Sequence, residues 1–150
     1  MRVILQRVSS ASVSIDTRVA GQIDRGLLIF VGIKGADTAA DGDWLAAKIV
    51  KLRLFADEAG PMNKSVADIG GGILLISQFT LHASTQKGSR PSFNAAARPE
   101  QARPLYEQFI HQLTTTLGRP IVTGEFGAKM QVALVNDGPV TLIIDSKQRE

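Results

Sequence analysis

Gly26-Leu27-Leu28-Ile29-Phe30-Val31-Gly32-Ile33 is an uninterrupted apolar run with the length of one β-strand. A strand that buries one face alternates apolar and polar residues, whereas a strand buried on both faces is apolar throughout. The run therefore predicts a strand that is covered on both sides. A second apolar run, Gly72-Ile73-Leu74-Leu75-Ile76, predicts another strand, which continues as far as Thr80.

Further strands are expected on both sides of these two runs, where Val, Ile and Ser are frequent or polar and apolar residues alternate. The expected segments are Val3 to Ile15 (one or two strands), Arg18 to Asp24 (a short pair with a turn near Ala20-Gly21), Met130 to Val135 and Val140 to Asp145. The last two would be joined by Asn136-Asp137-Gly138-Pro139.

A first helix is predicted from Asp37 to Phe55, followed by a turn from Asp57 to Pro61. Its apolar residues Leu45, Ile49 and Leu52 recur at the spacing of one helical face. This helix lies between two predicted strands, so strands and helices alternate along the chain.

A second helix is predicted from Arg98 to Leu117, with Leu105, Phe109 and Leu113 on one face. Pro104 is unfavourable inside a helix, and it suggests that the regular part begins around it. Two helices among several strands favour a mixed α/β fold, and the 150 residues fit a single domain, residues 1–150.

The composition is that of an ordinary globular protein, with 44% apolar and 21% charged residues. No apolar run approaches the roughly 18 residues of a membrane span, and none resembles a signal peptide. The chain has no cysteine and only two histidines. We therefore expect neither thiol chemistry nor a metal or other cofactor, and a reducing compartment such as the cytoplasm fits.

The positive charge is concentrated in one segment between His82 and Arg103. Its cations are Lys87, Arg90, Arg98 and Arg103, and its single carboxylate is Glu100. The local excess of +3 equals the net charge of the whole chain. This segment is either a solvated loop or a contact for a phosphate-bearing partner such as RNA.

Two hydroxyls end the second apolar run, in Ser77-Gln78-Phe79-Thr80-Leu81. On an extended strand Gln78, Thr80 and His82 share one face, so Thr80 would face solvent if Phe79 packs inward. A hydroxyl nucleophile needs a base, and neither histidine stands in a recognisable motif with Thr80. The hydroxyls either carry hydrolytic chemistry or satisfy backbone groups at a strand end.

The Gly138-Pro139 bond is unusual because Asn-Asp-Gly between strands normally predicts a tight hairpin. Pro139 removes a backbone donor and restricts the residue before it. The segment is either a plain structural turn or a rigid device that presents backbone carbonyls to a ligand.

At these residues the chain resembles the D-aminoacyl-tRNA deacylase family. The similar segments are Ser77-Gln78-Phe79-Thr80-Leu81, Asn136-Asp137-Gly138-Pro139-Val140-Thr141, Lys87-Gly88-Ser89-Arg90-Pro91-Ser92-Phe93, Phe126-Gly127-Ala128-Lys129-Met130-Gln131-Val132 and Arg2-Val3-Ile4-Leu5-Gln6-Arg7-Val8. The resemblance covers nearly the whole chain. It implies a cytoplasmic homodimer of compact, β-barrel-like α/β subunits with helices packed on them.

The resemblance also implies a site at the subunit interface. Ser77, Gln78, Phe79 and Thr80 would line the pocket around the ester bond of a D-aminoacyl-tRNA. Gly138 and Pro139 of the other subunit, joined by a cis bond, would exclude L-amino acids. Such steric exclusion would not reject glycine, so hydrolysis of glycyl-tRNA is expected as well. Lys87, Arg90, Arg98 and Arg103 would contact the tRNA.

The missing base is less serious for this substrate, because an aminoacyl-tRNA ester is already activated. Backbone N–H groups near Phe79 and Thr80 would stabilise the oxyanion while water attacks, and we favour this over a Thr80 nucleophile. His82 and Lys129 depart from the family pattern, which has an aromatic and often an acidic residue there. Two alternatives are a non-catalytic RNA-binding module and a small-molecule esterase that uses Thr80 or Ser77.

Overall fold

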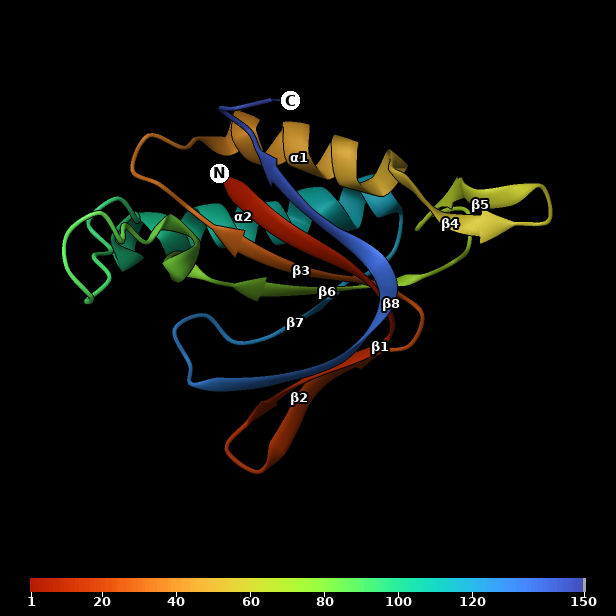
Figure 1. Cartoon of the computed structure of the whole chain (residues 1–150), viewed down its shortest axis with the longest axis horizontal. Helices are drawn as coiled ribbons and strands as arrows, with labels where there is room; N and C mark the ends of the chain where they lie inside the picture. The colour runs from red at the N-terminus through yellow and green to blue at the C-terminus, as the bar shows by residue number, and fades with distance from the viewer. Residues whose placement is uncertain (150) are drawn as a thin grey trace.

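The computed structural model describes residues 1–149 and contains one large sheet, a small hairpin, two α-helices and a 3-10 turn (Figure 1). In chain order the elements are β1 (Arg2–Ile15), β2 (Arg18–Ile23), β3 (Gly26–Gly32), α1 (Ala39–Lys51), β4 (Arg53–Asp57), β5 (Gly60–Ser65), β6 (Gly72–Ser77), η1 (Phe79–His82), α2 (Pro99–Leu117), β7 (Val122–Thr123) and β8 (Met130–Asp145).

The large sheet is organised around β1, which is long enough to pair along both of its edges. Residues 2–8 of β1 pair with β3 and residues 11–15 pair with β2, while β8 runs antiparallel along the opposite edge. β3 continues the sheet through the parallel neighbours β6 and β7. β1 and β8 curve strongly, so the sheet forms a nearly closed barrel with both helices on one side (Figure 1). The predicted mixed α/β fold is confirmed.

The two faces of β3 belong to different parts of the hydrophobic core. Leu27 and Ile29 pack in the cluster that includes the helices, whereas Leu28 packs in the cluster inside the curved sheet. All three side chains are fully buried. The prediction that this apolar run is a strand covered on both sides is confirmed, and β6 alternates in the same way.

The first helix is shorter than predicted. α1 begins after Thr38, where Thr38 and Asp41 form a reciprocal capping box, and it ends at Lys51. The chain then enters β4, so Phe55 is fully buried from a strand and not from a helix. The predicted turn after Asp57 is the connection of the β4–β5 hairpin, in which the Asp57 carboxylate accepts the N–H groups of Ala59 and Gly60.

The second helix has the predicted extent, but Pro104 lies inside it and does not mark its start. Pro104 leaves the carbonyl four residues earlier, that of Glu100, without a helical donor. Both residues are exposed, so water can reach this carbonyl. On the opposite face, the Tyr106 hydroxyl donates to the Leu75 carbonyl at 3.1 Å, and burial raises the pKa of Tyr106 to about 12. Tyr106 thus anchors α2 to β6.

Two predicted connections were wrong. The segment from Arg18 is one strand, β2, and its turn falls at Asp16, which has φ 56°. The two strands expected on either side of Gly138-Pro139 are one strand, β8, because both halves pair with β1. Neither helix of the described residues 1–149 is long and apolar enough to cross a membrane.

Candidate active site

The chain leaves β6 through a 3-10 turn, and this turn carries the hydroxyl of Thr80. The Gln78 N–H donates to the Val31 carbonyl at 2.7 Å, and Phe79 then begins η1. The expectation that the strand continues to Thr80 was therefore wrong, and the strand alternation does not decide which side chains face solvent. Phe79 is 58% exposed, whereas Thr80 is half-buried.

Among residues 1–149, no histidine or carboxylate forms a hydrogen bond with the Thr80 hydroxyl. Its Oγ1 accepts a hydrogen bond of 2.5 Å from Nε2 of Gln78. An amide N–H is a donor, so Gln78 cannot take the hydroxyl proton. Ser77 is at the end of β6, half-buried, and it pairs with Val31 of β3. Ser77, Gln78, Phe79 and Thr80 thus lie together at one end of the sheet.

Close backbone packing holds η1 against the end of β3. A Cβ on Gly32 would lie 2.9 Å from Leu81 Cβ and 3.0 Å from the Gln78 carbonyl oxygen, so only glycine allows this approach. Arg2 adds a polar link, because its guanidinium donates to the Leu81 carbonyl at 3.3 Å and to the Asp145 carboxylate at 3.0 Å. The turn is therefore fixed to β1, β3 and β8 together.

His82 ends η1, and its ring is only 4% exposed. Neither ring nitrogen has a hydrogen-bond partner within residues 1–149. Burial lowers the pKa of His82, the Gly32 backbone partly offsets this, and the nearby charges of Lys34 and Arg2 lower the pKa further. A buried neutral ring without a hydrogen-bond partner among the described residues is part of the packing of η1 and not a general base.

The buried neutral state of His82 predicts a pH-dependent stability. As the pH falls below about 6.5, His82 binds a proton in the unfolded chain but not in the folded chain. The free energy of unfolding should therefore decrease. The loss should have a slope of at most about 1.4 kcal/mol per pH unit and stop below the folded pKa. Urea unfolding of wild type and His82→Phe between pH 7.5 and 5 measures it.

The wild type should lose more stability across this range than His82→Phe. Carboxyl groups titrate mainly below this window, since an ordinary aspartate has a pKa of about 3.9. His111→Phe is the matched control, because it removes the other histidine, which is exposed on α2. Equal slopes in wild type and His82→Phe would contradict the assignment of a neutral buried ring.

Gly138-Pro139 lies in a loop that bulges out of β8. Gln6 of β1 pairs with Thr141 and Val8 pairs with Asn136, so one residue of β1 faces the four residues between them. The Gly138-Pro139 bond is cis. Both residues are exposed, and the nearest atom to a Cβ built on Gly138 is Oδ1 of Asn136 at 3.6 Å. The loop thus points away from its own subunit.

The side chain of Arg7 anchors this loop. Its guanidinium donates to the Asp137 carbonyl at 3.0 Å, pairs with the Asp137 carboxylate at 3.0 Å and donates to the Leu54 carbonyl at 2.5 Å. Asn136 closes the loop, because its amide donates to the carbonyls of Arg7 and Val140. The family resemblance includes Arg7 in the segment Arg2–Val8 but gave it no role, because its partners are distant along the chain.

The structure does not bring the two motifs together within one chain. Arg2 of β1 donates to Leu81 of η1, whereas Arg7 donates to Asp137 of the Gly138-Pro139 loop. Arg7 stands five residues further along β1 than Arg2. At about 3.3 Å per residue this separation is roughly 16 Å. Arg7 also joins the loop to the start of β4. Figure 1 shows β4 at the opposite end of the molecule from the green segment that follows β6. Within the described chain the two candidate motifs therefore lie apart.

The basic segment begins directly after η1. Ser84 and Ser92 exchange two backbone hydrogen bonds, which close a loop that contains Lys87 and Arg90. Phe93 follows this loop and packs edge-on against Phe79, with ring centroids 5.2 Å apart. The loop and η1 are thus neighbours.

Arg98 precedes α2, and Arg103 lies in its first turns, where its guanidinium stacks on Phe126 at 4.9 Å. All four cations of the segment are exposed. Lys87 and Arg90 lie in the loop that follows η1, and Arg98 and Arg103 lie at the start of α2.

Comparisons with known proteins agree along the whole chain. The sequence model of the family described as D-Tyr-tRNA(Tyr) deacylase matches residues 4–145. Proteins named D-aminoacyl-tRNA deacylase from Opitutus terrae and Dechloromonas aromatica are 59% and 57% identical over 150 residues, which is 100% of each chain.

Two solved structures share the fold. One, described as a c-Myc DNA unwinding element binding protein, has a TM-score of 0.91 and 42% sequence identity, with 97% of this chain and 98% of that chain covered. The other, a probable eukaryotic D-amino acid tRNA deacylase, has a TM-score of 0.84 over 96% of this chain and 98% of that chain; at 16% identity it supports the fold alone.

The family match over residues 4–145 and the relatives that align over all 150 residues define a hydrolase that acts on ester bonds. More closely, the chain belongs to the D-Tyr-tRNA(Tyr) deacylase family, whose curated relatives are named D-aminoacyl-tRNA deacylases. The predicted family is confirmed.

Proposed function

We propose that this protein hydrolyses the ester bond of D-aminoacyl-tRNA and releases the free D-amino acid and the tRNA, which removes D-amino acids before translation uses them. The observation that carries the proposal is the Gly138-Pro139 loop, which Arg7 holds in place while Gly138 and Pro139 themselves stay exposed. A single domain, residues 1–150, would act in the cytoplasm without a cofactor.

Catalysis would rest on the backbone of η1. The first N–H groups of a helical turn have no carbonyl partner within it, and in η1 these belong to Phe79 and Thr80. They would donate to the oxyanion that forms when water attacks the ester carbonyl. The ester C–O bond then breaks, and the ribose oxygen leaves with a proton, with help from the neighbouring 2′-OH. Each well-aimed donor contributes about 3 kcal/mol.

Thr80→Ala tests this assignment. Because Thr80 accepts a hydrogen bond from Gln78 and has no base, its loss should reduce kcat less than about 10-fold. A covalent nucleophile would instead be indispensable. Single-turnover deacylation of one D-aminoacyl-tRNA measures the effect, and circular dichroism checks the fold. Near-complete loss of activity in a folded variant would contradict the backbone mechanism.

The second half of the site would come from a second copy of the chain. β8 pairs with β1 on one edge only, and apolar residues stand exposed along it: Val135 at 57%, Leu142 at 36% and Ile143 at 70%. A long exposed apolar edge strand favours association. Leu142 and Ile143 of β8 pair with Leu5 and Ile4 of β1, which lie midway between Arg2 and Arg7. A two-fold axis there would bring the loop of one subunit to η1 of its partner.

In this homodimer the backbone of Gly138 and Pro139 would face the Cα of the bound amino acid and leave no room for an L side chain. Glycine has no side chain, so glycyl-tRNA would also be hydrolysed. Lys87, Arg90, Arg98 and Arg103 would contact the phosphates of the tRNA acceptor end.

A matched assay of the D- and L-forms of one aminoacyl-tRNA tests the proposed function. We expect rapid hydrolysis of the D-form and none of the L-form above the uncatalysed rate. Equal rates would defeat the proposal. A non-catalytic RNA- or DNA-binding module would retard the nucleic acid and leave the ester intact, and a simple esterase would hydrolyse small activated esters without tRNA.

A further inference from the structure

Arg2 links the end of β8 to η1 through two directed hydrogen bonds. Its Nε donates to the Asp145 carboxylate at 3.0 Å, and its Nη1 donates to the Leu81 carbonyl at 3.3 Å. The Arg2 side chain is 31% exposed and the Asp145 side chain only 11%. A charge-assisted bond to a shielded carboxylate is stronger than a bond between neutral groups. The guanidinium is therefore held on one side by Asp145 and holds Leu81 on the other.

The Asp145 carboxylate is itself fixed in place. It accepts the Lys147 N–H at 2.9 Å, and the Ser146 N–H donates to the Met1 carbonyl at 2.9 Å, which ties the end of β8 to the start of β1. Burial raises the pKa of Asp145, but the hydrogen bonds from Lys147 and Arg2 and the nearby positive charges outweigh it and keep the pKa below its usual range. Asp145 is therefore a charged partner for Arg2 at neutral pH.

Leu81 connects this pair to the first N–H group of η1. The Leu81 N–H donates to the Gln78 carbonyl at 3.2 Å. This carbonyl belongs to the same planar peptide unit as the Phe79 N–H, so the two groups turn together. The position of Leu81 therefore sets the direction of the Phe79 N–H. Leu81 in turn is placed by Arg2 and by its close approach to Gly32.

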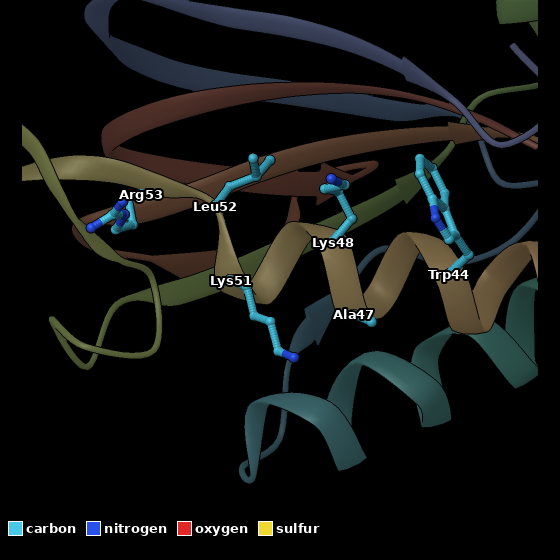
Figure 2. A pocket seen from close by; sticks show the side chains of 6 residues that line it. All are labelled: Trp44, Ala47, Lys48, Lys51, Leu52 and Arg53. Atoms are coloured by element: carbon cyan, nitrogen blue, oxygen red, sulfur yellow. The ribbon is translucent and has the colours of Figure 1, made fainter. Parts of the chain in front are cut away.

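Arg2 and Asp145 also line a cavity of about 500 Å³ between α1 and the end of β8. Trp44, Lys48 and Leu52 line it from α1, and Figure 2 shows these three side chains on the side of the helix that faces the strands. Lys48 lies 5.8 Å from the centroid of the Trp44 ring. It is a second cation of the same cavity, and within residues 1–149 no hydrogen bond joins it to η1. Arg2 thus differs from Lys48 in its link to the turn and not in its charge.

We propose that Arg2 is a positioning residue for ester hydrolysis, which holds η1 so that the Phe79 N–H points at the developing oxyanion. The inference rests on the proposed function, in which N–H groups of η1 stabilise that oxyanion. Such donors are effective because they are aimed before the reaction begins, and a misplacement of about 1 Å can cost roughly 100-fold in rate. Arg2 would act through Leu81, without touching the substrate.

Arg2→Gln tests this role. We expect kcat for D-aminoacyl-tRNA to fall about 10-fold with KM unchanged, because the oxyanion exists only in the transition state. The rate on D-aminoacyl-adenosine, which has no phosphates, should fall by the same factor. Arg2→Lys should not restore kcat, because a single ammonium cannot replace the fork of a guanidinium. Lys48→Gln is the matched control, since it removes the other cation of the cavity and should keep the wild-type kcat.

Asp145→Asn tests the same link with a side chain of the same shape. We expect it to lower kcat by a smaller factor than Arg2→Gln. The double variant should lose no more than Arg2→Gln alone, because the carboxylate acts through Arg2 and the two effects are not additive. Additive losses would overturn the inference, and so would a wild-type kcat in both single variants.

Amide hydrogen exchange tests the link in the absence of substrate. The N–H groups of Leu81 and Ala83 close η1 with bonds of 3.2 and 3.0 Å. Their exchange should be faster in Arg2→Gln and unchanged in Lys48→Gln, because a turn that has lost an anchor opens more often. Wild-type exchange in Arg2→Gln would overturn the inference.

Two further outcomes count against Arg2 as a positioning residue. A raised KM for D-aminoacyl-tRNA, with the wild-type rate on D-aminoacyl-adenosine, would mean that Arg2 binds a phosphate. Loss of the dimer in size-exclusion chromatography would mean that it acts through the interface. Failure of the proposed function would appear separately, as wild type that hydrolyses no D-aminoacyl ester while exchange in η1 still depends on Arg2.

Discussion

Gly138→Ala is expected to fold as stably as the wild type and to lose at least about 100-fold in kcat/KM for D-aminoacyl-tRNA, which corresponds to about 2.7 kcal/mol of transition-state stabilisation. The nearest atom to the added Cβ within the chain is 3.6 Å away, an ordinary van der Waals contact. Gly138 also lacks the positive φ that would strain an alanine. We therefore expect the alanine to leave the folding stability of the subunit unchanged.

The loss would arise outside the subunit, where the loop is proposed to approach the substrate closely in the partner's pocket. Steady-state kinetics, together with thermal unfolding of the same preparation, separates activity from stability. Gly35→Ala is the matched control, because a Cβ there lies 3.8 Å from its nearest neighbour and Gly35 is far along the chain from both motifs. A fully active Gly138→Ala enzyme would exclude this loop from the site.

Arg7→Ala is expected to destabilise the protein by about 2–3 kcal/mol and to abolish most of the activity. The Arg7 side chain is 13% exposed, and its removal leaves the Leu54 carbonyl and the Asp137 carboxylate without their donor. Buried groups without partners cost about 1–3 kcal/mol, and more when a charge is left alone. The cost of leaving the Asp137 carboxylate unpaired is limited, because Asp137 is 46% exposed and water can solvate it.

The midpoint of urea unfolding measures this stability change. Arg18→Ala provides the contrast, because Arg18 and Glu125 pair at 3.9 Å with side chains 65% and 66% exposed, and such pairs contribute less than about 1 kcal/mol. Activity should be assayed well below the unfolding temperature of Arg7→Ala, so that a misplaced loop and not an unfolded chain explains the loss. Equal stability of the two variants would show that Arg7 does not hold the loop.

Local pattern was sufficient to predict the central strand and the second helix, because both depend on which side chains are apolar at strand or helix spacing. The apolar run of β3 is covered on both faces as expected, and α2 begins within one residue of the predicted start. The same reasoning extended the first helix too far, since Phe55 continues the spacing of apolar residues although the chain has already entered β4.

The candidate site depended on contacts that no local pattern encodes. Asn-Asp-Gly favours a hairpin, yet both halves of β8 find the same partner strand, β1, and the segment between them bulges outward. Thr80 lies on a 3-10 turn because Gln78 bonds back to Val31 and the strand cannot continue. Arg7 and Leu54 are 47 positions apart, so their contact was invisible before the fold was known.

The separation of η1 from the Gly138-Pro139 loop along β1 has a consequence for the working range of the enzyme. If each site requires parts of two chains, a monomer has no activity. The activity per molecule should then fall when the protein is diluted below the dissociation constant of its dimer. The initial rate would then grow with the square of the protein concentration at high dilution. A newly made chain would gain its activity only after it had met another.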